Sequence, residues 1–250
     1  MSEKRVTSWS SHKGWSGTVS TTVDRATRAL PFVLSVIAGS TDIIGFLGLN
    51  GLFTAHITGN IVVLTAHMVA GEPAIISYIL SVPVFMLVLF LTRLAAGGLE
   101  RASVSTLPPL LLLQLLSLIA FLVLCVTSGP WTDANAILAI IAGMFGVAAM
   151  AMQNALVQIS LRNTPTTAVM TTNVTHFMLD LGELLVGRDQ AEIAKARIRA
   201  IHTLPVIFGF TIGCGLGAAC EAAAGLWSLA LPTGLALLAF AMGFRWLTAT

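Results

Sequence analysis

The chain has 250 residues, of which 56% are hydrophobic and only 10% are charged. Its mean hydropathy is +0.90, whereas soluble domains carry about 25% charged residues, so the composition excludes an ordinary soluble protein and indicates an integral membrane protein. The formal net charge of +2 gives no reason to expect a nucleic-acid partner.

Eight apolar elements follow a polar N-terminal segment. Residues 1–29 are rich in Ser and Thr and lack the apolar core and cleavage site of a secretion signal, so we expect a mobile cytosolic tail. The apolar runs are too long for strands, and a membrane-crossing helix needs about 20 residues. We therefore predict an all-α membrane protein. The predicted helical elements cover 30–48, 54–70, 74–97, 108–127, 134–160, 166–186, 201–223 and 229–247.

The second half of the chain resembles the first in the order of its short motifs. These are an Ala-Gly pair at 38 and 142, a Thr-x-Asn triplet at 58 and 171, a Pro between apolar residues at 83 and 205, and a Leu-Pro pair at 107 and 231. Membrane transporters often arise by internal duplication. We therefore predict two repeats, 30–127 and 134–247, within one membrane domain.

The basic residues predict the number of crossings, because cytoplasmic loops carry an excess of Lys and Arg. If all eight elements crossed, Arg93 and Arg101 would lie outside. If the first two elements of each half form one broken or re-entrant passage, all 13 basic residues lie inside, and the outer loops carry only Glu72, Asp133 and Glu221. We favour this arrangement, which gives about six net crossings, two inverted repeats and both termini in the cytoplasm.

Helix-interrupting clusters give a reason for the two broken passages. Gly-Leu-Asn-Gly at 48–51 interrupts the first half, and Arg-Asn-Thr-Pro at 162–165 interrupts the second. Non-helical backbone at membrane depth needs partners within the protein or in a water-filled cavity. Polar side chains near both breaks are therefore expected to face the protein interior.

Asp42 is the strongest candidate for a functional residue. An acid within an apolar segment is costly in lipid and usually lies on a solute or proton pathway. A low dielectric constant favours its protonated form, which suits the proton acceptor of a proton-coupled transporter. The alternative is structural: Asp42 caps the break or pairs with a polar residue of the other half.

His56 is a second candidate in the same block. It lies four residues before Asn60, so the two side chains share a face if this part is helical. A role as ligand or proton relay is compatible with the sequence, and so is a histidine bonded to a backbone carbonyl.

Two polar clusters occupy equivalent positions in the predicted halves. Their uncharged donors and acceptors suit coordination of a solute, and they equally suit hydrogen bonds between helices. Gln153 and Asn154 leave the same two alternatives open. The residues assigned to a substrate or proton pathway are Asp42, His56, Thr58, Asn60, Gln153, Asn154, Thr171, Thr172, Asn173 and Thr175.

Weaker candidates follow in the second half. His176, Asp180 and Glu183 have the spacing of one helix stripe, which suits a metal site or proton relay and equally a water-facing surface. No matching partner cluster exists, so we predict no metal site. Residues 188–199 are typical of a short amphipathic helix on the cytoplasmic surface. The glycine-rich run 211–217 predicts close helix packing.

Two blocks of the chain carry a family resemblance. The first contains Ala-Gly at 38–39, Asp42, phenylalanines at 46 and 53, His56 and Thr-Gly-Asn at 58–60; the second runs from 143 to 155 and resumes at 171–175. Both resemble the YoaK-type family of bacterial inner-membrane proteins, whose function is uncharacterised. The chain departs from that pattern at His176, where the family tends to have Gly. The resemblance implies a multi-pass inner-membrane protein and brings no activity with it.

These features predict a small secondary transporter or channel-like permease for a small polar solute or ion, and Asp42 suggests proton coupling. The expected partners are the lipid bilayer and the solute, and a homo-oligomer is compatible with the sequence. No enzyme motif is present, so neither catalysis nor a cofactor is expected. One alternative is a membrane-embedded binding or assembly protein whose polar residues only lock helices together. Another is a metal enzyme built on Asp42, His56 and the His176 stripe, which would require bound metal.

Overall fold

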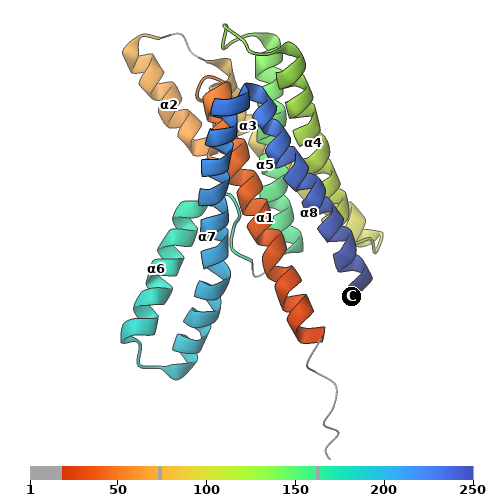
Figure 1. Ribbon diagram of the computed structural model, residues 1–250, viewed down its shortest axis with the longest axis vertical. Coiled ribbons are helices and arrows are strands. Elements are labelled where there is room, and N and C mark those ends of the chain that lie inside the picture. The colour runs from red at the N-terminus through yellow and green to blue at the C-terminus, as the bar shows by residue number, and fades with distance from the viewer. Residues whose placement is uncertain (1–18, 73–74, 162–163, 250) are drawn as a thin grey trace, which may run out of the picture.

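The computed structural model describes residues 19–72, 75–161 and 164–249, with side chains described between 29 and 244. Over these residues it consists of helices and their connections and contains no strand (Figure 1). The predicted all-α class is therefore confirmed. The helices are α1 (Val19–Gly48), α2 (Ile57–Ala70), α3 (Ile76–Arg101), α4 (Leu107–Ser128), α5 (Ile137–Ser160), α6 (Met170–Val186), α7 (Gln190–Ala224), the short 3-10 helix η1 (Gly225–Leu229) and α8 (Ala230–Ala249).

Five helical segments in the described part of the chain are long and apolar enough to cross a membrane. They are Ala29–Gly48, Ile76–Arg101, Leu107–Ser128, Ile137–Ser160 and Gln190–Phe244. The last segment has 55 residues and contains α7, η1 and most of α8. The shorter helix α2 is also apolar. These segments support the predicted multi-helix membrane character.

Two helices begin earlier than predicted. α1 begins at Val19 rather than at 30, and residues 1–18 of the predicted tail lie outside the described residues. α7 begins at Gln190, so the prediction of a separate amphipathic helix over 188–199 is wrong. The reason is local: Asp189 caps α7 by accepting the backbone N–H of Ala191, and the Ala, Glu, Lys and Arg residues that follow all favour a continuous helix.

Long helices from the two halves of the chain pack against each other. The closest pairs include α1 with α7 and α3 with α5, while α4 packs against α5 and α8, and α1 against α8. In Figure 1, α4 and α8 lie on the right, and α2 and α6 lie on the left, where they extend toward opposite ends of the molecule. The first turns of α1 and the C-terminal end of α8 lie at the same lower end.

The core divides into two hydrophobic clusters. The larger one joins α1, α4, α5 and α8 and includes the buried side chains of Leu34, Leu118 and Met150. The other lies around the end of α1 and includes Leu52 and Phe121. Burying each such side chain contributes about 1.5–3 kcal/mol where it is withdrawn from water.

α2 and α6 contribute little to this core. Only Ile57 and Asn60 of α2, and only Asn173 and Asp180 of α6, are buried. α2 packs chiefly against α3, and α6 packs chiefly against α7. Because few buried contacts hold them, we expect these two helices to open locally at a lower free energy than the long helices.

Glycines bring the backbones of α1 and α7 into contact. A Cβ atom added at Gly213 would overlap the carbonyl oxygen of Val36, and one added at Gly39 would overlap the carbonyl oxygen of Phe210. Helices approach this closely only where a side chain is absent. The predicted close packing of the run 211–217 is thus confirmed at Gly213, whereas Gly215 in the same run faces open space.

Replacing Gly213 with Ala should lower the free energy of unfolding by about 1–3 kcal/mol, because the added methyl group overlaps a helix backbone. The matched control is Gly215→Ala, where nothing lies within 4 Å of the added Cβ, and it should leave stability unchanged or slightly raised. Thermal unfolding of the detergent-solubilised protein measures both. Equal unfolding midpoints for the two variants would contradict the close contact of α1 and α7.

Candidate functional site

The connection between α1 and α2 is organised around the carboxylate of Asp42. Its Oδ1 accepts the backbone N–H groups of Thr54 at 2.8 Å and Ala55 at 2.7 Å, and its Oδ2 lies 2.6 Å from Nδ1 of His56. Asp42 is only 4% exposed. Successive backbone N–H groups that converge on one anion neutralise much of the cost of burying it. α2 therefore starts at Ile57 rather than at the predicted 54, because the preceding N–H groups bind Asp42.

Asn60 holds the same connection from the other side. Its Oδ1 accepts the backbone N–H of Phe53 at 2.9 Å, and its Nδ2 donates to the carbonyl of Phe53 at 2.8 Å. Asn60 is fully buried. One side chain thus satisfies both backbone groups of a residue that belongs to no helix.

The connection between α5 and α6 uses the same device. Nδ2 of Asn173 donates to the carbonyl of Thr166 at 2.6 Å, so in both connections an Asn binds the backbone seven residues before it. Gln153 on α5 donates to Oγ1 of Thr167 at 2.8 Å, in the place where Asp42 on α1 binds Thr54. α6 therefore starts at Met170 rather than at the predicted 166.

Gln153 also ties the two halves of the chain together. Its Nε2 donates to the carbonyl of Leu34 on α1 at 2.8 Å, and its Oε1 accepts Nε2 of Gln114 on α4 at 2.7 Å. Gln153 is fully buried. A buried amide with this many partners fixes the relative positions of three helices.

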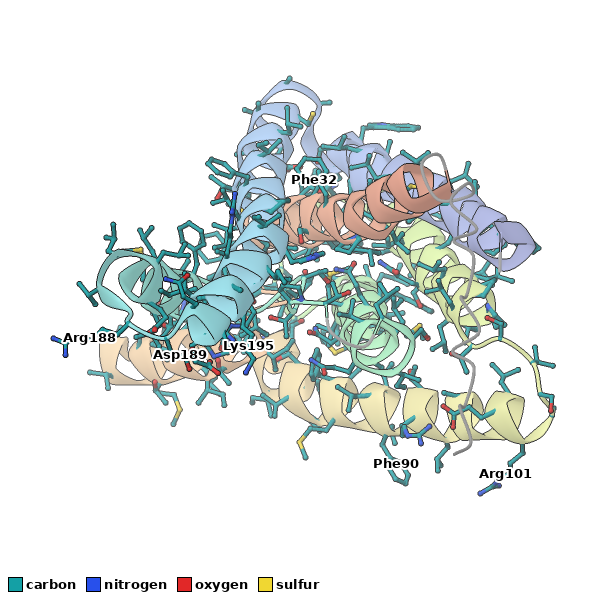
Figure 2. The ribbon with its side chains drawn as sticks, turned by 90° about the horizontal axis from the view of Figure 1, so that it is seen from below. Phe32, Phe90, Arg101, Arg188, Asp189 and Lys195 are labelled. Atoms are coloured by element: carbon teal, nitrogen blue, oxygen red, sulfur yellow. The ribbon has the colours of Figure 1, made fainter. Side chains whose placement is uncertain are left out.

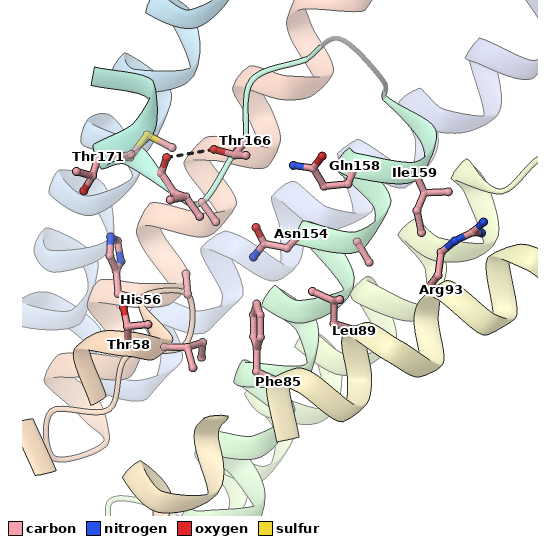
Figure 3. Close-up of a pocket in the computed structure, with 16 residues that line it drawn as sticks. His56, Thr58, Phe85, Leu89, Arg93, Asn154, Gln158, Ile159, Thr166 and Thr171 are labelled. Atoms are coloured by element: carbon pink, nitrogen blue, oxygen red, sulfur yellow. Dashed lines mark hydrogen bonds between the residues drawn. The ribbon is translucent and has the colours of Figure 1, made fainter. Parts of the chain in front are cut away.

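A central cavity of about 580 Å³ lies where the two connections meet (Figure 3). One side is formed by Ala55–Thr58, and the other by Thr166 and the segment 168–171. The remaining walls come from Phe85, Leu89 and Arg93 of α3 and from α5. The α5 residues are Asn154, Ala155, Gln158 and Ile159. The lining is mostly apolar with a few polar side chains, which is typical of small-molecule sites.

Two helices begin at this cavity. α2 starts at Ile57 and α6 at Met170, and both residues line it together with Thr58 and Thr171. The first N–H groups of a helix have no partner within the helix and carry a partial positive charge. The cavity therefore combines hydroxyl groups, amides and two helix N-termini around one volume.

The structure divides the predicted site residues into three groups. His56, Thr58, Asn154 and Thr171 line the central cavity. Asp42, Asn60, Gln153 and Asn173 are buried and bind the two connections, which is the structural alternative stated for such residues. Thr172 and Thr175 are exposed on α6, where Thr172 lines a second cavity and Thr175 donates to the carbonyl of Thr171.

Two of the three weaker candidates, His176 and Asp180, line a second cavity of about 660 Å³ between α6 and α7. Thr172, Asn173, His176 and Asp180 line it from α6. Glu183 belongs to neither cavity. Among the residues with described positions, no group of three His, Cys, Asp or Glu side chains is placed to hold a metal ion.

Three polar or charged lining residues of the central cavity were not predicted. They are Arg93, Gln158 and Thr166. Arg93 could have been identified from the sequence, because it is a charged residue within an apolar element. Gln158 lies one helical turn after Asn154 on α5, so helical periodicity would have placed it on the same face.

The apolar helices, the two non-helical connections and the cavity between them define a multi-helix membrane protein with a mostly apolar cavity where two helices begin. The model of the family described as "Protein of unknown function (DUF1275)" matches residues 30–242, and the chain belongs to this family. The YoaK-type resemblance is consistent with that membership, although the family description does not carry the name. No curated protein and no solved structure matches the chain.

Replacing Asp42 with Ala should lower the free energy of unfolding by about 2–5 kcal/mol, because the buried N–H groups of Thr54 and Ala55 lose their acceptor. Asp42→Asn keeps one acceptor oxygen and should lose less. Glu100→Gln is the control for removing a carboxylate, since the Glu100 side chain is 41% exposed. Thermal unfolding in detergent ranks the variants. An Asp42→Ala protein as stable as the control would show that the carboxylate does not hold the connection.

Proposed function

We propose that the protein is a small secondary transporter or channel-like permease for a small polar solute or ion. The observation that carries the proposal is the central cavity, to which the first turns of α2 and α6 both contribute (Figure 3). Discontinuous helices that meet at a polar cavity are typical of transporters, since their free N–H groups and hydroxyl groups replace water around a solute. Thr58 and Thr171 would contact the solute from opposite sides.

The proposal includes two inverted repeats, α1–α4 and α5–α8. In this relation α1, α2, α3 and α4 correspond to α5, α6, α7 and α8. In support, replacing each helix by its counterpart turns the packed pair α1–α7 into the packed pair α3–α5, and turns α4–α5 into α1–α8. The matched Asn60 and Asn173 bonds agree with this relation. α2 and α6 extend from the middle toward opposite ends (Figure 1), as inversion requires. Each would be re-entrant, which leaves six net crossings.

The lower end in Figure 1 would face the cytoplasm of a bacterial cell, with the protein in the inner membrane. Viewed from that end, Arg101 and Arg188 lie at the periphery and Lys195 lies inside the outline (Figure 2). Acidic Glu72 and Asp133 belong to the connections α2–α3 and α4–α5 at the upper end. An excess of basic residues on one side supports this orientation.

Replacing Thr58 or Thr171 with Val should lower uptake about 3- to 10-fold, because each change removes one hydroxyl contact worth about 0.5–1.5 kcal/mol while keeping the side-chain shape. Uptake is measured in reconstituted vesicles, first with a panel of labelled small polar solutes under a pH gradient. Thr127→Val is the control, since the exposed hydroxyl of Thr127 binds the Val123 carbonyl of its own helix, α4, outside the cavity. Absence of flux for every solute, or flux unaffected by both cavity variants, would refute the permease.

Reporter fusions test the orientation. A fluorescent protein that folds only in the cytoplasm should be active when fused to either terminus, and a phosphatase that needs the periplasm should be active only when inserted beside Asp133. The physical reason is the excess of Lys and Arg at the end that carries both termini. Opposite locations for the two termini would exclude an even number of crossings.

A second function is favoured by a specific observation. Asp42, Asn60, Gln153 and Asn173 all use their polar atoms in internal hydrogen bonds. This is what a membrane-embedded binding or assembly protein would require, because its polar residues only hold helices together. Such a protein would show no flux in vesicles and would be recovered from membranes with a stoichiometric partner.

A further inference from the structure

α6 is fastened to the rest of the protein at two points. Asn173 fixes its first turn to the preceding connection, and Asp180 is its only other buried residue. Asp180 binds Arg199 of α7, the helix against which α6 chiefly packs. Beyond the first turn, this ion pair is therefore the one buried polar attachment of α6 among the residues that the structure describes.

The ion pair uses only one of the two carboxylate oxygens of Asp180. Nε and Nη2 of Arg199 lie 2.9 Å and 2.6 Å from the same carboxylate oxygen, Oδ1 of Asp180. The other oxygen, Oδ2, is buried and has no hydrogen-bond partner among the described residues. The Asp180 side chain is 6% exposed, whereas that of Arg199 is 55% exposed. An unpartnered buried carboxylate oxygen is costly, and the cost falls when the oxygen takes up a proton.

Asp180 lines the second cavity, of about 660 Å³, between α6 and α7. His176 of α6 and Arg199, His202 and Thr203 of α7 line it as well. Thr166 lines both this cavity and the central one, so the two volumes adjoin. The second cavity thus lies between the central cavity and the lower end, beside the helix that the ion pair holds.

We propose that Oδ2 of Asp180 is a proton-binding site and that its protonation releases α6 from α7. The proton comes from water in the second cavity and forms an O–H bond on Oδ2. The neutral acid no longer attracts the guanidinium of Arg199, which water then solvates. The lower part of α6 separates from α7 and opens the central cavity toward the lower end. This inference rests on the proposed permease only for its consequence, the coupling of a proton to solute movement.

The charges of Asp180 and Arg199 cancel, so the second cavity offers no net attraction to a metal cation or to an anion. A proton differs from both because it forms a covalent O–H bond with the unpartnered Oδ2. The other titratable groups at the cavity are His176 on α6 and His202 on α7. Glu183 and Glu192 add negative charge around Arg199. Loss of the Asp180 charge leaves Arg199 with only the neutral carbonyl oxygen Oδ1 as acceptor, and the two glutamates act on Arg199 through their charge rather than through a described hydrogen bond.

The test measures the separation of α6 and α7 directly, without any solute. The full chain, with Cys125, Cys214 and Cys220 replaced by Ser or Ala, receives spin labels at Leu185 and Ile201, which are 77% and 42% exposed. Distances are recorded in lipid nanodiscs from about pH 8 to about pH 4, a range that covers ordinary carboxylate and imidazole titration. In the parent protein, a longer distance should appear as the pH falls.

Variants identify the titrating group. Asp180→Asn should show the longer distance at every pH, and Asp180→Glu should keep the pH dependence. Asp189→Asn, which changes an exposed acid at the start of α7, is the matched control and should behave like the parent protein. Replacing His176 and His202 together with Gln should leave the response in place.

Three results would overturn the proposal. They are a distance that does not change with pH in the parent protein, a pH response that survives in Asp180→Asn, and a response abolished by the two histidine replacements. Each is independent of uptake. A normal distance response in a protein that transports no solute would support the proton site and refute only the permease.

Discussion

Non-helical backbone within an apolar bundle must find its hydrogen-bond partners inside the protein, and this constraint governs both connections. Lipid offers no donor or acceptor, so an unsatisfied N–H or C=O group costs several kcal/mol. Asp42 and Asn60 bind backbone groups of residues 53–55, and Asn173 binds the backbone carbonyl of Thr166. Gln153 binds the side-chain hydroxyl of Thr167 and so fixes the second connection without satisfying its backbone. The polar residues that stand out most in the sequence thus use their polar atoms in hydrogen bonds that hold the fold together.

The site follows from what those residues hold in place. Because Asp42 and Asn60 fix the first connection and Asn173 fixes the second, the first turns of α2 and α6 are brought to one cavity. The polar groups that line the cavity are three threonine hydroxyl groups, two amides, an imidazole and two helix N-termini, and the His56 imidazole and the Asn154 amide also bond within the protein. Arg93 is the charged residue of the lining, and the Asp42 carboxylate and the Asp180–Arg199 pair lie beside it.

Periodicity and helix breakers predicted the all-α class, the eight elements and the places where two of them are interrupted. Internal similarity of the sequence predicted that Thr58 and Thr171 occupy equivalent positions, and both residues line the cavity. The hydrogen-bond partners of Asp42 could not be predicted from the sequence, because the connection that brings Thr54 back to Asp42 has no helical periodicity. The bond from Gln153 to Leu34 spans 119 residues and depends on tertiary packing alone. The start of α7, by contrast, was predictable from the Asp189 cap and the helix-forming residues after it.

The glycine contact between α1 and α7 limits how such a protein could move. These helices come from opposite halves of the chain, and at Gly39 and Gly213 their backbones touch without intervening side chains. A rocking-bundle cycle, in which one half tilts as a rigid body against the other, would have to separate them. In the proposed permease, conformational change would therefore be confined to the peripheral helices α2 and α6, with the long helices as a static frame.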